Sequence, residues 1–203
     1  MIDTPKSLGN LRHRAERLAQ INDTHIAELT AFVNCLRNER GCGDKAPYFD
    51  PADGGVGAEV LFILEAPGKK AVDSGFISCN NPDETAKNWL ELNIQAKIPR
   101  KRTIAYNIVP WYIGSDNKIR SANSDDIEQG WPYLVQLLTM LPKLKIIVLI
   151  GKKAQRVASR LRVVRPDLRI MDCPHPSPLY VNNKPENRDI LLSALRKIAT
   201  ALD

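Results

Sequence analysis

The segment CPHPSPLYVNN, residues 173–183, holds one histidine between two prolines. Pro174 and Pro176 restrict the backbone on either side of His175 and exclude a helix or a central strand there. A side chain held this rigidly suits a reaction in which charge develops, because a preorganised donor needs no rearrangement. We therefore interpret His175 as a candidate catalytic residue. A rigid surface loop with an incidental histidine is the alternative.

Two more polar side chains stand near the ends of apolar runs. Glu65 follows EVLFIL (59–64), where a carboxylate could orient a water molecule or act as a base. Asn107 lies within TIAYNIV (103–109), and its carboxamide can read an edge that carries both N–H and C=O groups. The structural alternatives are a polar residue that ends a strand and an amide that satisfies nearby backbone.

Weaker signals occur in two glycine-containing loops. Phe76, in Gly75-Phe76-Ile77, could stack on a flat ligand, although such a ring more often fills the core. Gly151, Lys152 and Lys153 come where a helix is expected to start, which suits a phosphate and equally suits solvent.

The elements that must position these residues are read from hydrophobic patterning. Strands are predicted at 59–64, 103–109, 145–150 and 168–172. The first, EVLFIL, is a short continuous apolar run, as expected of a strand buried on both faces. Between and after them, helical patterns predict helices at 125–141, from about 153, and at 186–202. Another is predicted in NPDETAKNWLEL, with Asn81 as its cap and Pro82 in its first turn.

This order of elements predicts an α/β fold, a three-layer α/β/α sandwich around a central, mainly parallel four-stranded sheet. We expect a single domain over residues 1–203. Within it, residues 1–57 form a helical N-terminal extension and loop, with two helices in 8–38, and residues 58–203 form the α/β core. Ligands bind beyond the carboxyl ends of such strands, so the loops 65–81, 110–124, 151–153 and 173–185 should meet at one site.

Composition sets broad limits. The 203 residues carry a formal net charge of +6, which is compatible with a nucleic-acid partner without requiring one. No apolar run is long enough to span a bilayer and the start lacks a signal-peptide segment, so a cytoplasmic protein without a membrane partner is predicted. The four cysteines form no C-x-x-C pair and are interpreted as free thiols or core residues.

Five motifs together resemble one family. LEAPGKKA, GFIS, IPRKRTIAYNIVPW, LIGKKAQ and HPSPLYV, in this order over about residues 58–200, are similar to motifs of the uracil-DNA glycosylase superfamily. The first three look most like its thermophilic-type branch, and HPSPL is closer to the bacterial and eukaryotic branch. The thermophilic-type branch carries a four-cysteine iron–sulfur cluster. Here its C-x-x-C pair is missing and Pro110-Trp111 stands where a later cysteine is expected, so we expect no cluster and no other metal or cofactor.

The resemblance implies a role for each matching residue. Glu65 would hold or activate water, and His175 would bond the uracil 2-oxo group as charge builds there. Phe76 would stack on uracil, Asn107 would read its edge, and Leu179 would fill the gap left by the flipped nucleotide. The predicted substrate-binding residues are Glu65, Ala66, Gly68, Phe76, Asn107 and His175, and the predicted DNA-binding residues are Lys69, Lys70, Gly151, Lys152, Ser177 and Leu179.

The implied function is that of a monofunctional, monomeric uracil-DNA glycosylase acting on single- or double-stranded uracil-containing DNA. Three alternatives stay open: a glycosylase for another deaminated base such as hypoxanthine or xanthine, a lesion- or abasic-site-binding protein with little turnover, and a small-molecule α/β hydrolase or nucleotide-binding module. The second is favoured by Ala66, which replaces the aspartate of the bacterial and eukaryotic branch. Gly68 replaces the tyrosine with which that branch excludes thymine, so rejection of thymine is open.

Overall fold

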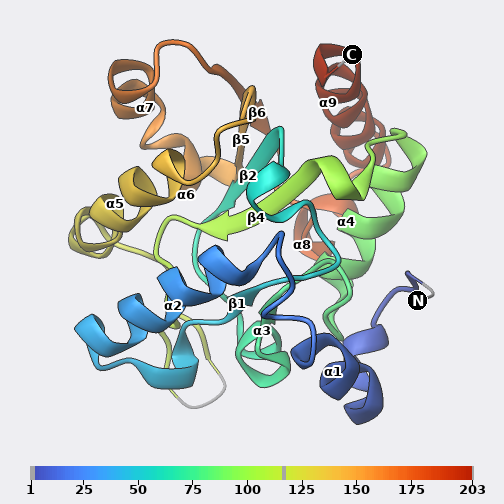
Figure 1. Cartoon of the computed structure of the whole chain (residues 1–203). Helices are drawn as coiled ribbons and strands as arrows, with labels where there is room; N and C mark the ends of the chain where they lie inside the picture. Colours follow the sequence, from blue (N-terminus) through green and yellow to red (C-terminus); the bar gives the residue numbers. More distant parts are fainter. Residues whose placement is uncertain (1–2, 116–117, 203) are drawn as a thin grey trace.

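The computed structural model describes residues 3–115 and 118–202. Its centre is a four-stranded sheet in the order β4-β2-β5-β6, with every neighbouring pair parallel (Figure 1). The predicted α/β fold and four-stranded sheet are confirmed. The strands are β2 (Val60–Leu64), β4 (Thr103–Asn107), β5 (Ile146–Ile150) and β6 (Arg169–Cys173).

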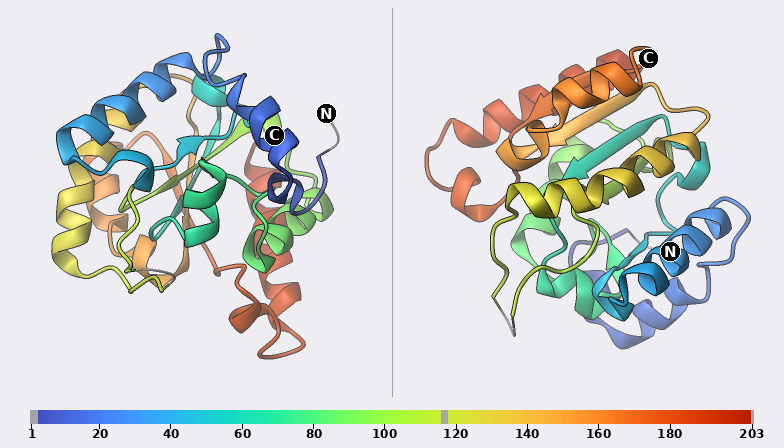
Figure 2. Two further views of the ribbon diagram at one scale, coloured as in Figure 1. Left: turned by 90° about the horizontal axis from the view of Figure 1, so that it is seen from below. Right: turned by 90° about the vertical axis from the view of Figure 1, so that its left-hand side faces the viewer.

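Helices cover both faces of this sheet, as the continuous apolar run EVLFIL predicted. Val60 and Phe62 pack on one face with α4 (Glu84–Gln95) and α9 (Asn187–Leu202). Leu61 and Ile63 pack on the other face, in a core to which four helices contribute. These are α2 (Ala27–Arg40), α5 (Ser124–Thr139), α6 (Gly151–Gln155) and α7 (Ala158–Val164), and the two helical layers are seen in Figure 1 and, turned, in Figure 2.

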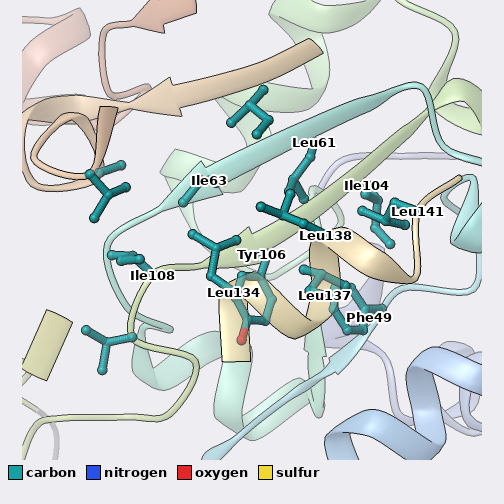
Figure 3. Packing of buried hydrophobic residues seen from close by; sticks show 14 of the residues in the cluster. Phe49, Leu61, Ile63, Ile104, Tyr106, Ile108, Leu134, Leu137, Leu138 and Leu141 are labelled. Atoms are coloured by element: carbon teal, nitrogen blue, oxygen red, sulfur yellow. The ribbon is translucent and has the colours of Figure 1, made fainter. Parts of the chain in front are cut away.

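Tyr106 anchors the second of these cores. Its ring stacks on Phe49, with 5.7 Å between ring centroids, and lies beside Leu134 and Leu137 of α5 (Figure 3). Successive side chains of a strand point to opposite faces. Burial of Tyr106 toward α5 therefore directs the next residue, Asn107, toward the α4 side.

The N-terminal segment contributes more than two helices and a loop. It contains α1 (Leu11–Leu18), whose Leu11 and Leu18 are exposed, and α2, whose apolar side chains join the core of the sheet. The predicted loop at 39–57 holds strand β1 (Tyr48–Phe49), which pairs in parallel with β3 (Phe76–Ile77) in a second, two-stranded sheet. Short 3-10 turns lie at Ser7–Gly9, Gly43–Lys45, Gly55–Gly57 and Arg100–Arg102.

Three local expectations need correction. Helix α4 starts at Glu84 and is capped by Asp83, because the Asn81 amide instead bonds the Ser74 hydroxyl and the Phe76 carbonyl. Helix α3 (Lys69–Ser74) was not predicted. Helix α8 (Pro178–Val181) forms in the proline-rich segment, because Ser177 caps it and Pro178 occupies its first position, where proline is tolerated.

A buried group of ionic and polar side chains joins the N-terminal segment to the sheet. Asp50 is 0% exposed and accepts from Arg17, from Ser78, and from Arg100 Nη2 at 2.8 Å. Burial alone would raise the pKa of Asp50, but the charges of Arg100 and Arg17 hold it below its usual value. We call this group the Asp50 network; its members are Arg17, Asp50, Asp53, Ser78, Asn80 and Arg100.

No helix in the described ranges, 3–115 and 118–202, combines the length and the apolar character needed to cross a membrane.

Candidate active site

A cleft of about 850 Å³ opens where β2 and β4 end. Its walls come from the segment after β2, from α3, from the start of α4, from the loop before α5 and from the segment after β6. Three of the four loops predicted to meet at the carboxyl edge of the sheet, 65–81, 110–124 and 173–185, line this cleft, and residues 151–153 do not. Predicted site residues on its lining are Glu65, Ala66, Gly68, Lys69, Lys70, Asn107 and His175.

Asn107 is the last residue of β4 and is 3% exposed. Its Oδ1 atom is buried and, among the described residues, has no hydrogen-bond partner, although the residue lines the cleft. Buried polar side-chain atoms nearly always have a partner, and leaving one unmade costs about 1–3 kcal/mol. The structural alternative, an amide that satisfies nearby backbone, does not account for this atom. A ligand in the cleft would.

Glu65 directly follows β2. Its Oε1 accepts from the Ser121 hydroxyl at 2.9 Å and from the Ala122 N–H at 2.6 Å. Within the part of the chain that the structure describes, Oε2 has no hydrogen-bond partner. The Glu65 backbone carbonyl also accepts from Val109 N–H at 3.0 Å, which ties the ends of β2 and β4 together. The carboxylate is therefore oriented through one oxygen and open at the other.

His175 lies two residues beyond β6 and is partly buried. Gly151, in a left-handed conformation at φ +78°, lies against the ring, because a Cβ built there would be 3.4 Å from the His175 Cβ. The next residue is fixed as well, since Asn88 Nδ2 donates to the Pro176 carbonyl at 3.0 Å.

Burial lowers the pKa of His175 below its ordinary value of 6.5, while the charges of Glu65 and Asp83 act in the opposite direction. At neutral pH the imidazole is therefore neutral. A neutral imidazole donates from one ring nitrogen and accepts at the other.

Phe76 is not brought to the cleft. It lies in β3 with its ring 1% exposed, and the residue after it, Ile77, lines the cleft instead. The Phe76 side chain therefore does not line the cleft in this structure, and its stacking on a ligand stays a prediction. The alternative that the ring fills the core describes this structure.

The predicted phosphate contacts differ in how far their charges are available. Lys69 forms an ion pair with Asp73 one helical turn away, so its charge is partly compensated. Lys70 and Lys152 are exposed, and no ion pair of theirs is found among the described residues. Lys153, considered beside them, donates to the Ala122 carbonyl at 2.7 Å. Gly151 faces the His175 side chain, since a Cβ built on Gly151 would lie 3.6 Å from the His175 Cδ2 atom.

Leu179 lies on α8 and Ser177 directly precedes it, in the part of the chain that projects from the body of the molecule (orange-red in the left view of Figure 2). Ser177 caps the helix, accepting from Tyr180 N–H at 3.4 Å. Leu179 is 87% exposed, the highest value among the large apolar side chains described. An isolated leucine this exposed on a projecting turn is suited to insert into a partner.

Sequence reasoning missed several residues of the site. Ile119, Arg120, Ser121 and Trp89 line the cleft, and Asn88 holds the histidine segment. The loop 110–124 was expected at this edge of the sheet, but none of its side chains was selected, because the partner of Ser121 is 56 residues away. Only the tertiary structure brings the two together.

The arrangement supports a definite chemistry. An unpaired amide can bind a flat ring that presents N–H beside C=O, and a neutral imidazole can donate to negative charge on that ring. A carboxylate with one open oxygen can orient water. Among the described residues, no three His, Cys, Asp or Glu side chains are grouped to hold a metal ion.

Comparisons with known proteins identify the family to which the chain is similar. The family model of the Uracil DNA glycosylase superfamily matches residues 51–199, which confirms the resemblance to that superfamily. Among solved structures, wild-type SMUG2 of Pedobacter heparinus is similar at 13% identity and a TM-score of 0.54, over 92% of this chain and 98% of that one. A candidate uracil DNA glycosylase of Methanosarcina acetivorans is similar at 16% identity and a TM-score of 0.47, over 71% and 94%. No curated protein matches the chain.

Proposed function

Because the chain belongs to the uracil DNA glycosylase superfamily, we propose that it is the uracil-specific kind of DNA glycosylase, which releases uracil and leaves an abasic site. The observation that carries this proposal is the buried, unpartnered Oδ1 of Asn107 in a cleft shared with Glu65 and His175.

Recognition of the base rests on Asn107. Its Oδ1 accepts from uracil N3–H while Nδ2 donates to uracil O4. Cytosine presents the reversed polarity at this edge, so binding it would leave polar groups unpaired on both sides. Uracil thus completes the unmet acceptor of Asn107, and cytosine does not.

Access to the base requires extrusion from the duplex, which costs a few kcal/mol. Leu179, exposed on α8, fills the space that the nucleotide leaves in the stack. Lys70, Lys152 and the Ser177 hydroxyl contact backbone phosphates and set the register of the protein on the strand.

Bond cleavage uses the two remaining groups. As the bond between uracil N1 and the sugar C1′ breaks, its electron pair stays on uracil, and His175 donates to the 2-oxo group where charge gathers. Water held by the open Oε2 of Glu65 adds to C1′ and gives up one proton through the carboxylate. The uracil anion takes up a proton on release. Because no protein nucleophile is used, the DNA strand stays uncut.

The direct test is incubation with duplex and single-stranded oligonucleotides that contain one uracil, followed by alkali and gel electrophoresis. We expect strand breaks only after alkali, and none on matched strands with cytosine at that position. If uracil is released neither from the duplex nor from the single strand, the proposal is refuted. Binding without multiple turnover would favour the lesion-binding alternative instead.

A glycosylase with a wider range of bases is the second candidate, because the wall of the cleft is open at Gly68. A Cβ built on Gly68 would meet nothing within 4 Å. A duplex panel with hypoxanthine, xanthine and thymine tests this reading. If the open wall at Gly68 determines which bases are released, Gly68→Tyr should restrict release to uracil. An unchanged range of released bases would mean that another part of the cleft determines it.

A further inference from the structure

The loop before α5 is fastened onto the cleft at three points. Ser121 and Ala122 bond Glu65, the Ala122 carbonyl accepts from Lys153 Nζ at 2.7 Å, and Arg120 bonds both oxygens of Asp126 at 2.5 and 2.7 Å. We call Arg120, Ser121, Ala122 and Lys153 the clasp. It connects the ends of β2, α5 and α6 through one short stretch of chain.

The clasp has a specific consequence for the carboxylate. Both donors converge on Oε1 of Glu65, and within the described chain Ser121 is the one side chain that hydrogen-bonds Glu65. A glutamate otherwise rotates freely about its terminal bonds. Fixing Oε1 fixes the direction in which Oε2 points, and small errors in the placement of a reacting group are costly.

We propose that Ser121 is the positioning residue for Glu65, and that Lys153 supports it through the Ala122 carbonyl. This role rests on the proposed function, because it concerns the water that Glu65 orients. Ser121 does not touch the base or the sugar. It acts on the reaction through the orientation of one carboxylate.

A purely structural role for the loop makes different predictions. Loss of loop packing would weaken DNA binding or lower stability, whatever residue stands at 65. Loss of positioning would slow the chemical step and leave DNA affinity unchanged. Its effect on the rate would disappear in a variant that lacks the Glu65 carboxylate. A double-mutant cycle separates the two, because residues that act through one another are not additive.

The experiment measures single-turnover uracil release and DNA affinity for the full chain and its variants. Ser121→Ala should release uracil about tenfold more slowly, the lower end of what one hydrogen bond to a charged group contributes, with DNA affinity within about twofold. Ser121→Thr keeps the hydroxyl and should restore most of the rate. In a Glu65→Ala background, Ser121→Ala should cause no further loss. Thr139→Ala removes an exposed hydroxyl of α5 whose one hydrogen bond within the described ranges is to the Gln136 carbonyl; it is the matched control and should leave the rate unchanged.

Lys153→Met provides the second arm. It should slow release in the same direction but less than Ser121→Ala, without lowering DNA affinity. A loss of affinity would instead make Lys153 a phosphate contact and remove it from the clasp.

Other results would overturn either the positioning role alone or the proposed function. A wild-type rate for Ser121→Ala, or an equal further loss in the Glu65→Ala background, would overturn the positioning role while uracil release by the wild type upholds the function. No release by the wild type would overturn the function, and the positioning role with it.

Discussion

Two polar clusters lie next to each other in this molecule and differ in how their groups are paired. In the Asp50 network, Asp50 accepts from Arg17, Arg100 and Ser78, and Arg100 also bonds Asp53. In the cleft, the Asn107 Oδ1 and the Glu65 Oε2 have no partner among the described residues. Ser78 belongs to both regions, since it lines the cleft and bonds Asp50.

The difference shows how to tell a structural polar cluster from a functional one. Buried charges persist only when they are paired, because removing them from water costs several kcal/mol for each ion. An unpaired buried polar atom indicates a ligand site only where it adjoins a cleft, as Asn107 Oδ1 does, since the Tyr106 hydroxyl in the apolar core also has no partner among the described residues. Both clusters contain a buried polar group, Asp50 at 0% and Asn107 at 3% exposure, and the unmet acceptors beside the cleft distinguish the second cluster.

The largest effect should follow from breaking the network. Asp50→Ala leaves Arg17 and Arg100 without their shared carboxylate, and losing one partner of a buried ion pair costs about 3–5 kcal/mol. Urea denaturation should show this loss in the free energy of unfolding. Uracil release per folded molecule should stay close to that of the wild type at low temperature. Unchanged stability would mean that the network is not what joins the N-terminal segment to the sheet.

The opposite pattern is expected in the cleft. His175→Ala should lower the single-turnover rate of uracil release about 10²–10³-fold, since one preorganised donor is lost, with little change in stability or DNA affinity. His13→Ala is the control, because that histidine is exposed on α1. A near-normal rate for His175→Ala would remove the imidazole from the mechanism.

A smaller effect should separate duplex from single-stranded substrates. Leu179→Ala loses apolar surface that the duplex buries, and full burial of a leucine contributes about 1.5–3 kcal/mol. Release from duplex DNA should fall about tenfold and release from single strands should not. The matched control is Val163→Ala, because Val163 is 81% exposed on α7, and it should change release from neither substrate. Equal losses on both substrates would argue against insertion.

The smallest effect is a pH dependence that distinguishes the two regions. Burial lowers the pKa of His175, so below pH 6.5 the unfolded chain takes up a proton that the folded chain does not. The contribution of His175 to the free energy of unfolding should therefore fall as the pH drops below 6.5, by at most about 1.4 kcal/mol per pH unit. It is measured as the difference between the wild type and His175→Gln, because burial raises the pKa of Asp53 to about 7 and that group acts in the opposite direction. His175→Gln should lose this slope. Asp50, whose pKa is lowered, affects stability only below about pH 4, its ordinary range. Identical slopes for the wild type and His175→Gln between pH 5 and 6.5 would contradict this assignment.

Much of the sheet and part of the site could be predicted from the sequence because their signals are local. An apolar run such as residues 60–64 is buried on both faces and predicts a central strand whatever surrounds it. Glu65, Asn107 and His175 follow or end such runs, and parallel strands deliver their ends to one edge. The short pair β1 and β3 was missed because two residues give no periodicity.

The remaining parts depend on contacts between distant residues. Phe76 was expected in the cleft because its motif matches, but whether a ring is exposed depends on how β3 packs, which no local pattern states. Asn81 was expected to cap a helix, yet its amide bonds Ser74 and Phe76. The clasp residue Ser121 meets Glu65 only after folding.

The central claim is that the unpaired amide of Asn107 is completed by uracil. The measurement that tests it most directly is single-turnover release of uracil and of cytosine from matched duplexes, by the wild type and by Asn107→Asp. A carboxylate lacks the donor for uracil O4 and accepts from the cytosine amino group. We therefore predict that the preference for uracil over cytosine falls by about 100-fold, the worth of two hydrogen bonds. The same preference in both proteins would contradict the account.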